Sequence, residues 1–147
     1  MTTLILMLLL INGNFSDGLN HWDANGAWFA ARGEARLQVN NPNENTVGAL
    51  LCSEPQAATN AVMHGTASVW QNNQNGYVFT GARWYDQTGA RLYDEMAVNN
   101  EGGAVKQWKQ LEFTVNRPAN AAQVSFCFYA GIYKGASKVR VDNAAWR

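Results

Sequence analysis

The chain consists of short apolar runs separated by glycine- and asparagine-rich segments, and this spacing constrains its fold more than any other feature. No stretch keeps an apolar stripe at helical spacing for three turns. The runs are rich in Val, Phe, Tyr, Trp and Thr, which favour extended strands. We therefore predict an all-β protein with strands over residues 27–31, 34–39, 46–52, 63–70, 77–86, 90–96, 108–115, 123–130 and 138–146.

Several of these segments alternate between apolar and polar residues, which identifies the side that faces the core. The residues predicted to point inward are Ala35, Leu37, Val39, Leu111, Phe113, Val115, Val124, Phe126 and Phe128. About nine or ten strands in one open sheet would leave an apolar face in water, so two packed sheets are needed. No linker or internal repeat divides the chain, and we expect a single domain over 1–147.

The segment Leu4 to Ile11 is almost entirely apolar. It is too short to cross a bilayer, which takes about 20 apolar residues. It also lacks the basic flank and the small-residue cleavage site of a signal peptide. We interpret it as a first strand, buried on both faces or against a neighbouring subunit, and we expect no export signal.

The composition argues against nucleic acid and anionic membranes as partners. Eleven basic residues balance eleven acidic ones, so no net field attracts nucleic acid or an anionic membrane. Charged residues make up only 15% of the chain, whereas asparagine and glutamine recur in segments 40–45 and 71–75. Amides suit recognition of sugar hydroxyls, because they both donate and accept hydrogen bonds. They equally suit plain solubility and turn formation.

Cys52 and Cys127 each lie within an apolar stretch. A buried free thiol packs like a small hydrophobe, and we expect two free thiols. A single bridge between strands is the alternative, because the sequence does not give the distance between the two Cα atoms.

Segments along the chain, in order, resemble the carbohydrate-binding modules found beside xylanases and glucanases. They are INGNFSDGLNHW (11–22), ARWYDQTGARL (82–92), WKQLEFTVNRPANAAQVSFCFY (108–129) and VRVDNAAW (139–146). The resemblance covers nearly the whole chain and depends on the order and spacing of these motifs. It implies a jelly roll, a β-sandwich of two antiparallel sheets, with sugar bound on a concave face or at loop tips.

The resemblance also implies a structural calcium ion between the opening turn and the closing aspartate. Asp142 stands at the closing position, and Asp17 lies one place beyond the usual acidic position, which is Ser16 here. Calcium needs six or more oxygen ligands, and backbone carbonyls near Asn12 would have to supply others.

Six Trp and five Tyr residues exceed what a core of this size needs, so some of these rings should be exposed. Tyr77, Phe79, Arg83 and Tyr85 share one face of a strand, and Trp84 faces the core. We predict a ligand-binding groove formed by Trp70, Arg83, Tyr85, Gln123 and Tyr129. The alternative is that these aromatic residues close the sandwich or meet another subunit.

Other aromatic and ionisable residues have simpler expected roles. Trp22, Trp28 and Trp108 lie at junctions between loops and strands and are predicted to plug the ends of the sandwich, while His21 and His64 lack a ligand partner at metal spacing. No nucleophile elbow, metalloprotease helix or phosphate loop occurs. The acids near the hairpin, Asp86, Asp94 and Glu95, could in principle hydrolyse a glycoside, but we expect no enzyme activity.

We therefore expect a non-catalytic glycan-binding domain whose partner is an oligo- or polysaccharide. Such modules normally accompany an enzyme domain, which is not evident here, so we expect display in many copies, either with other copies of itself or on a particle surface such as a phage virion. The alternative is a structural decoration or cement subunit of such a particle with no sugar site. The expected location is a virion surface or the extracellular space.

Overall fold

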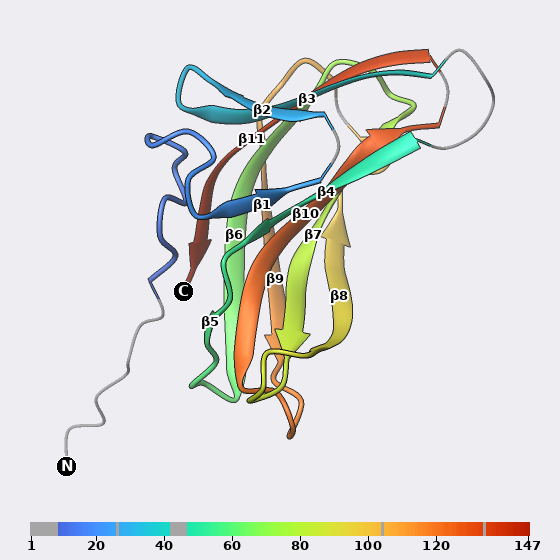
Figure 1. Cartoon of the computed structure of the whole chain (residues 1–147). Coiled ribbons are helices and arrows are strands. Elements are labelled where there is room, and N and C mark those ends of the chain that lie inside the picture. Colours follow the sequence, from blue (N-terminus) through green and yellow to red (C-terminus); the bar gives the residue numbers. More distant parts are fainter. Residues whose placement is uncertain (1–8, 26, 42–46, 104, 134) are drawn as a thin grey trace.

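Backbone hydrogen bonds arrange the chain into two antiparallel sheets that stack as layers (Figure 1). The computed structural model describes residues 9–25, 27–41, 47–103, 105–133 and 135–147. Within those ranges every regular element is a strand, as the sequence predicted, and no helix could span a bilayer.

The six-stranded sheet has the order β1-β4-β10-β7-β8, and β5 also pairs with β10. Its strands are β1 (Trp22–Ala24), β4 (Val47–Ser53), β5 (Gln56–Ala57), β7 (Gly76–Tyr85), β8 (Arg91–Asn99) and β10 (Gln123–Ile132). The five-stranded sheet has the order β2-β3-β11-β6-β9. It comprises β2 (Trp28–Ala31), β3 (Glu34–Asn41), β6 (Val62–Gln71), β9 (Lys109–Asn116) and β11 (Gly135–Trp146).

The strands predicted from residue 27 onward are confirmed, with small differences at their ends. The short strands β1 and β5 were not predicted, because three and two residues are too few to show an alternation. Residues 4–8 of the strand predicted over 4–11 lie outside the described part of the chain. The rest of that segment is not a strand: Leu9 and Leu10 are irregular, and Ile11 begins a turn in which Phe15 N donates to Asn12 O.

The inward-facing residues predicted from alternation are all buried, and Trp84 lies in the core with them. Trp22 and Trp28 are also buried in the core, as expected of residues that close the sandwich. Trp108 is a correction: its side chain is 42% exposed, and it stacks on Arg140 at the surface of the five-stranded sheet. It precedes β9, where alternation does not yet fix its direction.

A buried amide network joins two loops at one end of the sandwich. The Gln71 side chain is fully buried, and its Nε2 donates to Asn73 O and Gly76 O at 3.0 Å each. Its Oε1 accepts a hydrogen bond of 3.0 Å from Asn100 Nδ2. The network therefore fixes the loop before β7 and the loop after β8, because buried polar groups are costly unless they are paired.

Cys52 and Cys127 form a disulfide, which corrects the expectation of two free thiols. The two residues are directly opposite in the register of β4 and β10, and their Cα atoms are 4.1 Å apart. Directly opposed residues of antiparallel strands lie close enough to be bridged. The sequence placed both residues in strands but did not show that these strands are neighbours.

Replacing both cysteines with alanine is expected to lower the free energy of unfolding by about 2–4 kcal/mol. The bridge links residues that are 75 positions apart in sequence, so it restricts the unfolded chain strongly. Urea denaturation of the wild type and of the Cys52→Ala/Cys127→Ala variant measures the difference. A reducing agent should destabilise only the wild type, and equal midpoints in all samples would contradict the bridge.

Candidate functional site on the six-stranded sheet

Four of the predicted site residues lie on the outer face of the six-stranded sheet, three toward one end of β10 and Tyr129 toward the other. In the register of β7 and β10, Gln123 is opposite Tyr85 and Ser125 is opposite Arg83, while Tyr129 is opposite Phe79. Directly opposed residues point to the same side of a sheet. The residues between them, such as Val124 and Phe126, are buried in the core. Arg83, Tyr85, Gln123 and Tyr129 therefore all face away from the core.

Trp70 does not join these four, which corrects the predicted groove. It lies on β6, opposite Arg140 of β11, so it belongs to the outer face of the other sheet. Alternation correctly indicated that Trp70 points away from the core, since its neighbour Val69 is fully buried. The pattern carries no information about which sheet a strand enters, and this is why the assignment was wrong.

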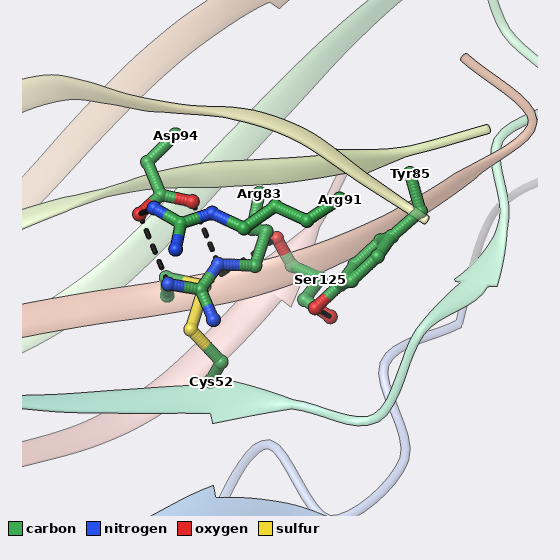
Figure 2. Close-up of polar contacts among 7 residues, drawn as sticks. Cys52, Arg83, Tyr85, Arg91, Asp94 and Ser125 are labelled. Atoms are coloured by element: carbon green, nitrogen blue, oxygen red, sulfur yellow. Dashed lines mark hydrogen bonds and ion pairs between the residues drawn. A yellow bond between two sulfur atoms is a disulfide. The ribbon is translucent and has the colours of Figure 1, made fainter. Parts of the chain in front are cut away.

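Arg83 is held by a carboxylate that it shares with a second arginine (Figure 2). Its Nε and Nη2 atoms donate to Asp94 over 2.7 and 3.0 Å. Arg91 Nη2 donates to the same carboxylate over 2.6 Å. Partial burial raises the pKa of Asp94, but the hydrogen bonds and charges of Arg83 and Arg91 outweigh this and hold the pKa below its usual value. The side chain of Arg83 is thus fixed in position.

The disulfide lies beside this cluster, and both of its cysteines are buried (Figure 2). Cys127 is two residues from Ser125 on the same side of β10, and it is opposite Gly81 of β7. Ser125 Oγ donates to Tyr85 Oη over 3.2 Å. The tyrosine hydroxyl and the guanidinium group of Arg83 therefore lie beside each other on neighbouring positions of one face.

A group of aromatic rings continues the same face toward the other end of β10. The Tyr77 ring is buried, and its centroid lies 5.0 Å from that of Tyr133 and 5.8 Å from that of Tyr129. Phe79 packs against Tyr77 with a centroid distance of 5.7 Å. Tyr129 and Tyr133 remain 36% and 39% exposed. Both side chains thus remain partly exposed beside the buried ring of Tyr77.

Sequence reasoning placed Tyr77 and Phe79 on the face of Arg83 but did not include them in the site, and it missed Tyr133. The alternation of Tyr129, Gly131 and Tyr133 is the signal that could have found it. Tyr133 Oη donates to the carboxylate of Glu101, and this hydrogen bond raises the pKa of the hydroxyl. The ring is therefore held by the loop that follows β8.

Gly48 on β4 is required by the positions of two of these rings. A Cβ atom built at this glycine would lie 2.5 Å from Tyr77 Oη and 2.7 Å from Tyr129 Oη. Such distances are too short for non-bonded atoms, so any side chain here would displace both hydroxyl groups. The absence of a side chain at Gly48 allows the tyrosines to lie across β4.

The face combines exposed aromatic rings with fixed polar groups, and this combination suits a ligand with two kinds of surface. The face of an aromatic ring is electron-rich and attracts the weakly positive C–H groups of a saturated ring. The amide of Gln123, the hydroxyl of Tyr85 and the guanidinium group of Arg83 offer hydrogen bonds to hydroxyl groups. Sugars present both kinds of surface.

The three acids considered for hydrolysis are engaged in separate contacts. Asp94 is paired with two arginines. Asp86 accepts hydrogen bonds from Thr88 and Ala90 within the turn between β7 and β8, and the Thr88 hydroxyl is the main cause of its lowered pKa. Glu95 accepts a long hydrogen bond of 3.4 Å from Trp84 Nε1. None of these contacts pairs one carboxylic acid with a second carboxylate.

Asp17 and Asp142, the residues implied for calcium, belong to no cluster of acidic side chains in the described part of the chain. Asp142 lies opposite Ser68 on the five-stranded sheet, and burial raises the pKa of its carboxyl. Asp17 lies in the opening loop, where the side chain of Asn12 donates to Gly18 O and Asn20 O over 3.0 and 2.8 Å. In the described ranges, no three His, Cys, Asp or Glu side chains gather as cation ligands. Calcium binding thus stays a prediction of the resemblance, and the residues described do not fit it.

We expect the melting temperature to be the same with excess EDTA and with millimolar calcium chloride. The Asn12 amide already donates hydrogen bonds to two carbonyls of the opening loop, and the described residues contain no cluster of acidic ligands. Calcium at 100 times its Kd would stabilise the protein by about 2.7 kcal/mol. For a chain of this size that corresponds to roughly 5–10 °C, and a rise of this magnitude would establish a calcium site.

Asp94→Asn is expected to lower the free energy of unfolding by about 1–2 kcal/mol at pH 7, because both arginines lose a charged acceptor. Since the pKa of Asp94 is lowered in the folded state, its contribution is complete above the unfolded value of about 3.9 and is lost as the pH falls through the folded value. Denaturation measured at pH values from 7 to 2 should show the free energies of unfolding of the wild type and of Asp94→Asn converging as the pH falls. Asp23→Asn on β1 is the control, and a difference independent of pH would exclude the ionised pair.

The sequence matches no protein-family model, and no curated protein matches it. Solved structures are similar in fold. A CBM4 carbohydrate-binding module superposes with a TM-score of 0.62 at 14% identity, over 90% of this chain and 98% of the module. The module TmCBM61, solved in complex with β-1,4-galactotriose, superposes with a TM-score of 0.61 at 15% identity, over 94% of this chain and 96% of that one.

A further similar structure is the enzymatically active domain of tailspike protein 4 from bacteriophage CBA120. It superposes with a TM-score of 0.58 at 15% identity, over 92% of this chain but only 20% of the tailspike chain. At these identities the comparisons establish the fold alone. The chain has the jelly-roll β-sandwich fold of carbohydrate-binding modules, as the sequence motifs indicated.

Proposed function

We propose that the outer face of the six-stranded sheet binds an oligo- or polysaccharide without cleaving it. The observation that carries this proposal is the pair of exposed rings, Tyr129 and Tyr133, held over the buried ring of Tyr77. Rings that are fixed before binding lose little conformational entropy when a ligand stacks on them. The rings on this face are therefore already in position to stack on the apolar side of a sugar ring.

The arrangement favours an extended ligand. Gln123 and Tyr129 are six residues apart on β10, which is about 20 Å along a strand. Tyr85 and Arg83 lie beside Gln123, and Phe79 lies beside Tyr129. A chain of several sugar units could contact the aromatic group with one unit and the polar group with another.

The fold supports this proposal, because carbohydrate-binding modules share it and one of them is solved with a trisaccharide. The engaged carboxylates support binding without hydrolysis, since Asp94 is fully used by Arg83 and Arg91. Weak sugar sites gain strength when several copies act together. Display in many copies on a phage virion is the context that we propose, and the similarity to a phage tailspike domain is its support.

A second candidate is a structural subunit of a virus or phage particle that binds no sugar; the similarity to a tailspike chain fits the particle context. Leu9 and Ile11 are exposed beside the opening loop and could contact a neighbouring subunit. The two candidates differ in what covers Tyr129 in the assembled particle. Sugar binding needs this ring to remain accessible, whereas a structural role would bury it.

Screening the purified protein on a glycan array, followed by calorimetric titration of the best ligand, tests the proposal. Tyr129→Ala is expected to weaken binding at least about fivefold, because tyrosine is enriched among the contact residues whose truncation costs more than about 1 kcal/mol. Tyr93→Ala is the matched control. Tyr93 is 46% exposed, but it lies opposite the core residue Trp84 and therefore on the other side of the sheet.

Equal loss of affinity in both variants would indicate a general effect on folding rather than a stacking site. Binding that survives Tyr129→Ala would place the sugar elsewhere on the molecule. A protein that binds no glycan at millimolar concentration but attaches to a purified particle would support the structural candidate.

A further inference from the structure

The outer face of the five-stranded sheet carries its own row of aromatic and basic residues. Phe29 on β2 is opposite Arg36 on β3, Arg36 is opposite Arg140 on β11, and Arg140 is opposite Trp70 on β6. Because directly opposed residues share a face, the four side chains cross four neighbouring strands in one line. This row lies on the side of the sandwich away from Tyr129 and Arg83.

Arg140 is held rigidly at the centre of the row. Its guanidinium carbon lies 5.1 Å from the centroid of Trp70 and 4.8 Å from that of Trp108, within the range of cation–π attraction. Its Nε and Nη2 atoms donate to Glu34 over 2.7 and 2.6 Å. This hydrogen bonding lowers the pKa of Glu34, so the carboxylate is ionised at neutral pH. Trp70 is thereby fixed in orientation.

A cavity of about 210 Å³ lies along this row. The side chains that matter for recognition are Phe29, Arg36, Gln38, Trp70, Lys138 and Arg140. Pockets that take drug-sized ligands measure roughly 300–1,000 Å³. The smaller volume here suits one ring with its substituents rather than an extended chain.

The cavity has an excess of positive charge. Three cationic side chains line it, and Glu34 beside them is shared by Arg36 and Arg140. Asp142 also interacts electrostatically with Arg140. Three positive charges and two negative charges leave a net charge of one. Lys138 is exposed, and the ion pairs of the described residues do not involve it. Its ammonium group is thus available to an anionic ligand.

We propose that this cavity binds a single carboxylated sugar ring, such as a uronic acid residue. The rings of Phe29, which is 42% exposed, and Trp70 provide apolar walls for the sugar C–H groups. Lys138 pairs with the carboxylate, and the Gln38 amide bonds the hydroxyl groups. The site is separate from the glycan-binding face on the six-stranded sheet and does not depend on it.

Titration of the ¹⁵N-labelled protein with methyl β-D-glucuronide, observed by NMR, tests this site directly. The indole N–H signal of Trp70 is expected to shift and to saturate at millimolar ligand. Methyl β-D-glucoside is the matched ligand, because it keeps the ring and lacks the carboxylate. It should bind at least tenfold more weakly, and added salt should weaken only the glucuronide.

Lys138→Ala is expected to reduce the glucuronide affinity at least fivefold while the rest of the spectrum is preserved, because this side chain is exposed. Lys109→Ala, which removes the same charge from β9, should leave the affinity unchanged. Tyr129→Ala should also have no effect, which separates this site from the one proposed above.

The proposal is overturned if glucuronide and glucoside bind equally, if neither shifts the Trp70 signal, or if Lys138→Ala retains full affinity. An acidic peptide that binds at the same residues more tightly than the glucuronide would also overturn it. The face would then be a docking surface for a protein segment.

Discussion

The antiparallel pairing of β7 with β10 determines the positions of most other features of the molecule. Both strands have ten residues and pair along their full length at the centre of the six-stranded sheet. One side of the pair supplies core residues such as Trp84 and Phe126, and the other side supplies Arg83 and Tyr129. A shift of one residue would exchange the two sides, so burial of the core also fixes the candidate site.

The outer faces of the two sheets hold arginine side chains by the same arrangement of ion pairs. In each case one partly buried carboxylate accepts hydrogen bonds from two arginines: Asp94 holds Arg83 and Arg91, and Glu34 holds Arg36 and Arg140. The planar guanidinium group suits such shared pairing, because its donors have fixed directions. Each group keeps one excess positive charge, and its side chains lose little freedom when a ligand arrives.

Period-two alternation in the sequence was enough to predict the strands, the inward-facing residues and the side of β7 that carries Arg83 and Tyr85. It could not assign strands to sheets, and Trp70 was placed on the wrong one for this reason. It also could not give the register that brings Cys52 opposite Cys127. Trp108 was misjudged because its position depends on a contact with Arg140, which is remote in sequence.

Gly48 restricts which residues can stand at the positions of the neighbouring tyrosines if this site is redesigned. Although it contributes no side chain, the space above its Cα atom is occupied by the hydroxyl groups of Tyr77 and Tyr129. A larger residue at position 48 is compatible only with smaller residues at these two positions. Libraries built to change the ligand of this scaffold should therefore vary the three positions together, since each of them limits the choice at the others.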